Sequence, residues 1–161
     1  MSTLIPPRPR MVGAKRTFVI VASQFNAQYV QGLVDHAIAE LHTLSPSAMV
    51  TVQHVPGAFE IPIVVRELAS SRHADAIIAI GVILQGQTSH AENLSRSVTD
   101  ALQRIAIDHG VPVINAVLSF GNELQARERC LENKINRGTE AAHAAIGIAN
   151  VMADLRKERH G

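Results

Sequence analysis

The chain has 161 residues, with 15 Lys and Arg against 14 Asp and Glu and a formal net charge of +1. This balance, with 3% aromatic residues and no Trp, gives no electrostatic or stacking reason to expect a nucleic acid or an anionic membrane as a partner. Cys130 is the only cysteine, so no intrachain disulfide can form, which indicates a reducing compartment and, by default, the cytoplasm.

Residues 1–14 are expected to form an extended arm, because Pro6, Pro7 and Pro9 exclude a helix there. The longest apolar stretch falls far short of the roughly 20 residues that a membrane-spanning helix needs. The proline-containing N-terminus also lacks the apolar core of a signal peptide. We therefore expect residues 15–161 to form a single domain with one core.

Strand-like runs alternate with helical spacing of apolar residues along the rest of the chain. Strands are expected at about 17–22, 48–54, 76–84 and 112–118. Helices are expected at about 30–41, 61–68, 94–105, 122–131 and 139–156, the fourth opened by a capping box of Asn122 and Gln125. Four strand–helix repeats without a linker predict a three-layer α/β/α sandwich around a mostly parallel sheet, although chain order does not give strand order.

The end of the third strand is the most informative place in the sequence. Its apolar run gives way to Gln-Gly-Gln-Thr-Ser-His, residues 85–90, just before a helix. Ligands of open α/β sheets lie at the carboxyl ends of such buried strands. Gly86, the hydroxyls of Thr88 and Ser89 and the N–H groups of the next helix suit an anion, most often a phosphate. His90 is the side chain there that can move protons near neutral pH.

Polar and aromatic side chains also follow the other strands, but each has a simpler interpretation when it is taken singly. Phe25 and Phe59 would be ordinary packing aromatics. Glu60 would be an acidic residue of a helix's first turn. Arg129 would be a solvent-facing residue, and Cys130 a small buried hydrophobic residue. Their common place at one edge of the predicted sheet is what favours a binding site.

Several enzyme classes lack their usual signatures in this sequence. There is no G-x-G-x-x-G, no G-x-x-x-x-G-K-[ST] and no Ser within G-x-S-x-G. The eight histidines show no metal-ligand spacing such as H-E-x-x-H, so no metal site is predicted. Hydride transfer, nucleotide hydrolysis and hydrolysis by a catalytic triad are therefore not indicated.

Four segments together resemble one enzyme family: V-P-G-A-F-E-I-P (55–62), G-V-I-L-Q-G-Q-T-S-H (81–90), P-V-I (112–114) and Q-A-R-E-R (125–129). They resemble the 6,7-dimethyl-8-ribityllumazine synthases of riboflavin biosynthesis over about residues 17–152. The resemblance implies a flavodoxin-like fold. It also implies condensation of 5-amino-6-(D-ribitylamino)uracil with 3,4-dihydroxy-2-butanone 4-phosphate, with release of phosphate and water and without cofactor or metal.

The resemblance implies a role for each matched residue. His90 would transfer protons, and Gln87, Thr88 and Arg129 would bind the phosphate. The pyrimidine substrate would be bound by Phe25, Ala58, Phe59, Glu60, Val82, Ile83, Leu84 and Asn115. Because the substrate amine is itself the nucleophile, the protein need only align the substrates, hold the phosphate and move protons.

The chain departs from the family pattern at several of these positions. The family often has Arg where this chain has Gln24 and Gln85, a small Ala at Gln87 and an aromatic residue at Asn115. Loss of that aromatic removes stacking area, although the Asn115 amide could hydrogen-bond a ring substituent instead. Arg137 stands where a lysine is usual and preserves the charge.

The resemblance further implies a homo-oligomer built from pentamers, as single pentamers, paired pentamers or 60-subunit shells. Each site would be shared, with Phe25, Glu60 and His90 from one chain and Asn115 and Arg129 from its neighbour. Riboflavin synthase is a candidate partner.

Three alternatives stay open. The first is a non-catalytic protein that binds a riboflavin-pathway ligand, motivated by Gln24, Gln85 and Asn115. The second is an archaeal-type riboflavin synthase, which acts on two lumazines and needs no butanone phosphate. The third is a flavodoxin-like or receiver-type signalling domain, which would need a carboxylate cluster where this chain has Ser23, Gln24 and Phe25.

Overall fold

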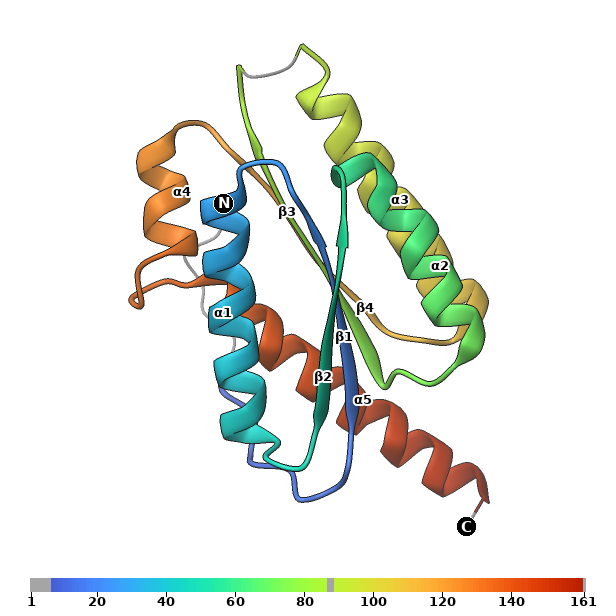
Figure 1. Ribbon diagram of the computed structural model, residues 1–161. Coiled ribbons are helices and arrows are strands. Elements are labelled where there is room, and N and C mark those ends of the chain that lie inside the picture. The colour runs from blue at the N-terminus through green and yellow to red at the C-terminus, as the bar shows by residue number, and fades with distance from the viewer. Residues whose placement is uncertain (1–6, 87–88, 161) are drawn as a thin grey trace.

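Four parallel strands form one sheet in the part of the chain that the structure describes, residues 7–86 and 89–160. In this computed structural model the strands are β1 (Thr17–Ser23), β2 (Met49–Val55), β3 (Ala76–Leu84) and β4 (Val113–Phe120). Their order across the sheet is β2-β1-β3-β4, and each neighbouring pair is parallel. The carboxyl ends of all four strands therefore lie along one edge of the sheet (Figure 1).

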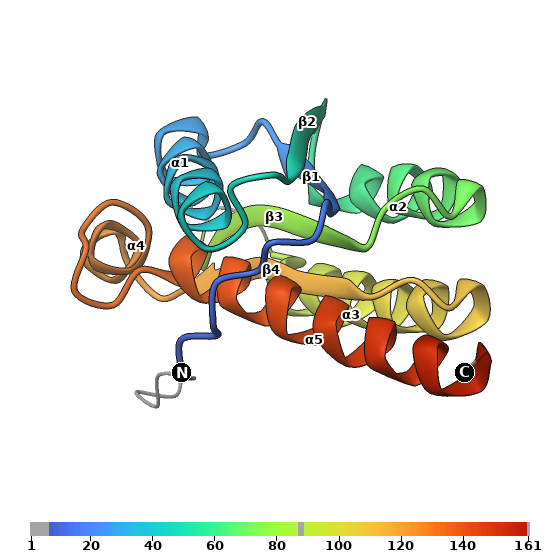
Figure 2. The same ribbon diagram turned by 90° about the horizontal axis from the view of Figure 1, so that it is seen from below.

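Helices cover both faces of this sheet. They are α1 (Ala27–Leu44), α2 (Ile61–Ser71), α3 (Ala91–His109), α4 (Glu123–Cys130) and α5 (Arg137–His160), and a 3₁₀ turn, η1 (Ala58–Glu60), precedes α2. Figures 1 and 2 show α1, α4 and α5 on one face and α2 and α3 on the other. The predicted three-layer α/β/α sandwich is confirmed. Within the described residues, no helix combines the length and the apolar character that crossing a bilayer requires.

The sequence of β3 explains its central place. All nine of its residues are buried, because β1 and β4 flank it and helices cover both its faces. Successive side chains of a strand point to opposite faces, so Ile78 and Ile80 enter the core under α1 and α5, whereas Ile77 and Ala79 enter the core under α2 and α3. β2 lies at an edge, and most of its residues are exposed or half-buried. The unbroken apolar run of β3 is thus the pattern of a strand between two helix layers.

The strand order creates a switch point between β1 and β3. From the end of β1 the chain crosses through α1 to β2 on one side, and from the end of β3 it crosses through α3 to β4 on the other side. The two connections leave on opposite faces of the sheet, so their first turns diverge and leave a crevice beyond the carboxyl ends of β1 and β3. In open α/β sheets ligands bind at this place.

The predicted strands and helices are all present. Helices α1, α2, α3 and α5 are longer than predicted, whereas α4 is slightly shorter. The last helix begins at Arg137 instead of about Thr139, because Asn136 caps it: the Asn136 Oδ1 accepts the backbone N–H of Gly138 at 2.8 Å and of Thr139 at 3.2 Å. The Asn122–Gln125 capping signal is confirmed in part. The Gln125 backbone donates to the Asn122 side chain at 2.9 Å, but the Gln125 side chain accepts from Gly121 instead of from Asn122.

Candidate functional site

A cavity of about 570 Å³ lies at the switch point between β1 and β3, and we name it the central cavity. Five of the residues predicted to bind substrate line it: Phe25, Ala58, Val82, Ile83 and Leu84. Its remaining lining residues are Ser23, Asn26 and Leu94. The wall is mostly apolar with a few polar groups, which is the usual character of a site for a small organic ligand.

Asn26 is a residue of this cavity that the predicted binding set omitted. It precedes α1 in the left-handed conformation, with φ 55°, and its side-chain Nδ2 donates a hydrogen bond to the Val82 carbonyl oxygen at 2.8 Å. This bond joins the β1–α1 turn to the end of β3 across the switch point. A signal existed in the sequence, since Asn adopts the left-handed conformation more readily than most residues and here follows a strand directly.

Phe25 and Glu60 both lie close to Gly57. A Cβ added to Gly57 would lie 3.2 Å from the Phe25 ring and 3.6 Å from the Glu60 Oε1. The interpretation of Phe25 as a packing aromatic is wrong for this chain, because 70% of the residue is exposed. Glu60 lies in the first turn of η1 and directly before α2, which agrees with the first-turn interpretation, and its side chain does not cap α2. Both side chains are free to contact a ligand.

Phe59 lies apart from these residues. It lines a groove of about 360 Å³ between α2 and α3, together with Pro62, Ile63, Arg66, Ser97, Val98, Ala101 and Ile105. The packing interpretation is wrong for Phe59 as well, because 71% of it is exposed. The side chain of Phe59 therefore belongs to a different surface from the central cavity, although its backbone neighbours Ala58 and Glu60.

The turn that begins after β3 is described only at Gln85 and Gly86 and again from Ser89 onward. Gly86 has φ 92°, a left-handed value that favours glycine. The Gln85 backbone N–H donates to the Phe120 carbonyl oxygen at 2.9 Å, which ties the start of the turn to the end of β4. Gln87 and Thr88, the two predicted phosphate-binding residues of this turn, lie outside the described residues.

His90 is the residue immediately before α3. It is exposed, its side chain does not cap the helix, and its carbonyl oxygen accepts the Leu94 backbone N–H at 2.8 Å. Leu94 lines the central cavity, whereas Ser89 and Ala91 line a polar groove shared with Gln85. His90 thus stands at the boundary between the predicted anion-binding turn and the central cavity.

Arg129 lies in a separate polar cavity of about 380 Å³, which we name the Arg129 cavity. Its other lining residues are Gln85, Ser119, Phe120, Gly121 and Gln125. Arg129 is half-buried, so the solvent-facing interpretation is only partly right. The neighbouring Cys130 is fully buried as predicted, and burial raises the pKa of its thiol to about 12.

Asn115 faces neither cavity within the single chain. Its side-chain Nδ2 donates to the Thr99 hydroxyl at 3.0 Å, and its Oδ1 accepts the Val117 backbone N–H at 3.0 Å. The second bond satisfies an outward-pointing N–H group of the edge strand β4. These contacts use one of the two N–H donors of the amide and one of the two lone pairs of its oxygen.

The charges at the site are unevenly divided. None of the described residues that line the central cavity is positively charged, and Arg129 stands in the other cavity. Within residues 7–86 and 89–160, no three His, Cys, Asp or Glu side chains gather where they could hold a metal ion.

The fold and the site define a class: an open α/β protein with an apolar, ligand-sized cavity at its switch point and a histidine beside it.

Comparison with known proteins identifies the family within this class. The family model described as 6,7-dimethyl-8-ribityllumazine synthase matches residues 15–153, and the chain belongs to this family. A 6,7-dimethyl-8-ribityllumazine synthase of Paraburkholderia phymatum is 38% identical over 151 residues, which cover 93% of this chain and 86% of that protein. The enzyme of the same name from Leptothrix cholodnii is 38% identical and covers 89% of this chain and 91% of its own length. A third, from Chromobacterium violaceum, is 36% identical with 92% and 94% covered.

Proposed function

We propose that this chain is a 6,7-dimethyl-8-ribityllumazine synthase that joins 5-amino-6-(D-ribitylamino)uracil to 3,4-dihydroxy-2-butanone 4-phosphate. The observation that carries the proposal is the central cavity at the switch point, because five residues that the family resemblance assigns to the pyrimidine substrate line it together. A volume of about 570 Å³ suits a ligand of this size. The reaction needs no cofactor, because the substrate amine supplies the nucleophile and the departing phosphate drives the elimination.

In this proposal the residues around Gly57 bind the pyrimidine. The exposed ring of Phe25 stacks on the pyrimidine ring, and Val82, Ile83 and Leu84 line the ring with backbone and side-chain groups. The segment of Ala58, Phe59 and Glu60 holds the ribityl chain, with the Glu60 carboxylate accepting hydrogen bonds from its hydroxyls. Because the Phe59 side chain faces the groove between α2 and α3, Phe59 contributes through its backbone.

His90 is the proposed proton-transfer group. Imine formation, phosphate elimination and ring closure each require a proton to move to or from a substrate atom, and an imidazole can do this in both directions near neutral pH. His90 lies one helical turn from Leu94, which lines the central cavity. The imidazole is therefore within reach of the reacting end of a bound pyrimidine.

The phosphate is proposed to bind at the turn after β3, on the backbone and hydroxyl groups of Gln87 and Thr88, with Arg129 as its charged partner. A guanidinium can hold a phosphate through two parallel hydrogen bonds. The N-terminus of α3 adds a favourable dipole for the dianion.

We further propose that the site is shared between subunits of a pentamer, with Arg129 and Asn115 supplied by the neighbouring chain. The absence of positive charge among the described lining residues of the central cavity supports this, since a phosphate substrate needs a cation that this wall does not provide. Arg129 opens on a different cavity of its own chain. A head-to-tail contact in a closed ring would bring one chain's Arg129 to the next chain's turn.

The same proposal covers the setting of the enzyme. Residues 15–161 act as one domain preceded by the arm, the enzyme works in the cytoplasm, and riboflavin synthase, which would consume the product, is a candidate partner.

The decisive experiment incubates the purified protein with both substrates and follows lumazine absorbance and phosphate release together. Formation of lumazine with one phosphate per product supports the proposal. Binding of the pyrimidine without turnover would favour the non-catalytic binding protein. In a second incubation with lumazine as the only substrate, consumption of lumazine without phosphate release would favour the archaeal-type riboflavin synthase. Absence of both binding and turnover would leave the signalling-domain alternative.

Mixed oligomers test the shared site. His90→Ala and Arg129→Ala chains are each purified, mixed, dissociated and reassembled. If each site takes His90 from one chain and Arg129 from the next, about a quarter of the sites in a random mixture regain both groups, and activity returns. If both groups come from one chain, every site stays defective and the mixture stays as inactive as its components. Sedimentation velocity on the same samples shows whether the particle is a multiple of five chains.

A further inference from the structure

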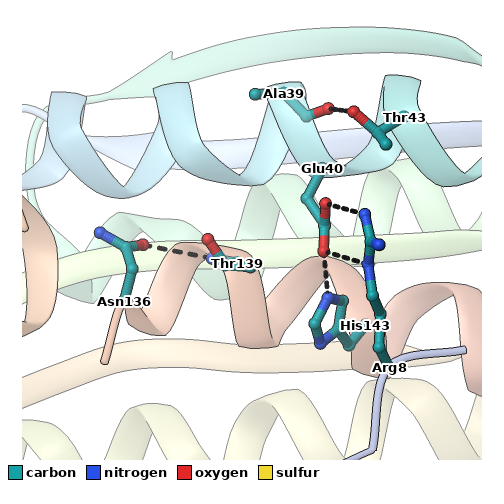
Figure 3. Close-up of polar contacts among 7 residues, drawn as sticks. All are labelled: Arg8, Ala39, Glu40, Thr43, Asn136, Thr139 and His143. Carbon is teal, nitrogen blue, oxygen red and sulfur yellow. Dashed lines mark hydrogen bonds and ion pairs between the residues drawn. The ribbon is translucent and has the colours of Figure 1, made fainter. Parts of the chain in front are cut away.

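Three charged or polar side chains meet on the face of the sheet opposite the groove between α2 and α3. Arg8 of the N-terminal arm donates two hydrogen bonds to Glu40 of α1, from Nε to Oε2 and from a terminal nitrogen to Oε1, each at 3.1 Å. His143 of α5 contacts the same Glu40 Oε2 through its Nε2. Figure 3 shows the arm and α5 approaching Glu40 from below while Glu40 projects down from α1. We name these three residues the clasp.

The geometry of the clasp makes it stronger than an ordinary surface ion pair. Only 14% of the Glu40 side chain is exposed, whereas 55% of the Arg8 side chain is, and Arg8 engages the carboxylate as a two-pronged fork. Ion pairs between two exposed side chains contribute little, because both side chains must be ordered and water screens them. Here the carboxylate is already ordered between two helices, so only the arm loses freedom when the fork forms.

His143 has a positioning role in the clasp. Only 9% of His143 is exposed, and its Nδ1 has no hydrogen-bond partner among the described residues. A buried N–H without an acceptor is costly, so the geometry favours the tautomer with hydrogen on Nε2, which donates to Glu40. This bond turns the Glu40 carboxylate so that its two oxygens face the arm. His143 therefore acts on the arm through Glu40.

The arm beyond Arg8 also follows the body of the protein. Pro9 and Val12 are half-buried, whereas Arg8, Arg10 and Met11 are exposed. The Val12 backbone N–H donates to the Leu44 carbonyl oxygen at 2.6 Å, and its side chain packs against the core that α1 and α5 share. Residues 7–16 themselves form no helix or strand. The arm therefore depends on two points of attachment, the clasp and the contact of Val12.

We propose that residues 8–12 form a releasable strap across α1 and α5, held shut by the fork between Arg8 and Glu40 and by His143, which orients Glu40. Opening the clasp leaves Val12 as the remaining attachment and releases residues 8–11 from the seam between α1 and α5, while the sheet and its central cavity stay folded. The strap is a conformational element of the fold and does not depend on the proposed function.

Native-state trypsin cleavage measures the opening of the strap in the full chain. Trypsin does not cut before proline, so Arg8 is resistant and Arg10–Met11 is the first cleavable bond of the chain. When opening is faster than cleavage, the rate reports the population of the open arm. Losing hydrogen bonds to a charged group should raise that population by about tenfold or more. We expect this increase in Arg8→Ala and in Glu40→Gln, and a smaller increase in Arg8→Lys, which keeps the charge but not the fork.

Variants of His143 distinguish its hydrogen bond to Glu40 from the space that its ring fills between α1 and α5. His143→Leu fills the space without a donor and should speed cleavage at Arg10, whereas His143→Gln returns a donor near the Nε2 position and should restore protection. Glu67→Gln is the matched control, because it removes a carboxylate from the exposed Arg66–Glu67 pair, far from the arm. Thermal midpoints are recorded for every variant to detect unfolding. Arg8→Ala alters only the arm, so it tests the strap even if a variant of Glu40 or His143 unfolds. Cleavage of Arg8→Ala at the same rate as the wild type and Glu67→Gln would overturn the proposal.

Discussion

The ring of Phe25 lies against Gly57, so closely that a Cβ at residue 57 would come within 3.2 Å of the Phe25 Cε2. Gly57 has φ −145°, extended backbone that any residue adopts, so the only obstacle to a side chain is this contact. Gly57→Ala should therefore displace the Phe25 ring and weaken pyrimidine binding by about tenfold while changing the thermal midpoint little. Calorimetric titration of the pyrimidine against both proteins checks this. Gly147→Ala, where an added Cβ meets nothing within 4 Å, is the control and should leave binding unchanged.

Replacing His90 should slow the reaction without unfolding the protein. General acid–base groups contribute roughly 10²–10⁴-fold, and the loss is expected near the low end because the condensation also proceeds slowly without a catalyst. His90 is exposed and does not cap α3, so His90→Ala should keep the wild-type thermal midpoint. Steady-state kinetics measure the loss of turnover, and differential scanning fluorimetry measures the thermal midpoint. An unchanged turnover number would remove His90 from the mechanism.

Arg129→Ala should weaken the phosphate substrate selectively. A lost hydrogen bond to a charged group is worth roughly 1.5–3 kcal/mol, which corresponds to an increase of about 10- to 150-fold in its Michaelis constant. Pyrimidine binding should stay nearly intact. Arg127→Ala is the matched control on the same helix, because Arg127 is exposed and lines neither cavity. Equal weakening of both substrates by Arg129→Ala would indicate a collapsed site instead of a lost phosphate contact.

The loss of stability on replacing Asn26 should depend on which residue replaces it. Its side chain bonds the Val82 carbonyl at 2.8 Å and its backbone is left-handed, with φ 55°. Asn26→Ala loses the bond and strains the backbone, for an expected cost of about 2 kcal/mol, whereas Asn26→Gly loses only the bond and should cost about 1 kcal/mol. Urea denaturation of both variants gives the difference. Equal stabilities would show that the backbone conformation contributes nothing.

The contribution of the clasp to the free energy of unfolding should decrease at low pH. Burial works to raise the pKa of Glu40, but the hydrogen bonds from Arg8 and His143 outweigh it and hold that pKa below the ordinary 4.5. A carboxyl with a lowered pKa in the folded state stabilises the fold above its unfolded value and loses that contribution as the pH falls through the folded value. The raised pKa of Arg8 keeps the guanidinium charged throughout this range.

The comparison is between the wild type and Glu40→Gln. The difference in their free energies of unfolding should be about 1–3 kcal/mol near pH 5, and it should shrink toward pH 3. Chemical denaturation across this range measures it. A difference that does not change with pH would mean that Glu40 has the same pKa in the folded and unfolded states.

Local patterns in the sequence were enough to predict the elements and the edge of the sheet where ligands would bind. The unbroken apolar run of β3 predicted a strand buried on both faces, and Asn122 with Gln125 predicted the start of α4. These inferences succeed because strand burial and helix capping depend on residues close together in the chain. The motif around residues 55–62 and 81–90 was likewise sufficient to indicate the family.

The strand order, and with it the position of the cavity, was decided only by the tertiary structure. Any of several orders would bury the same apolar strands, and β2-β1-β3-β4 is what puts Phe25 beside Val82 and sends the Phe59 side chain to another groove. The clasp joins residues 32 and 103 positions apart in the chain. Contacts of this kind depend on how whole layers pack, because a carboxylate such as Glu40 acquires its partners only when α1, α5 and the arm have come together.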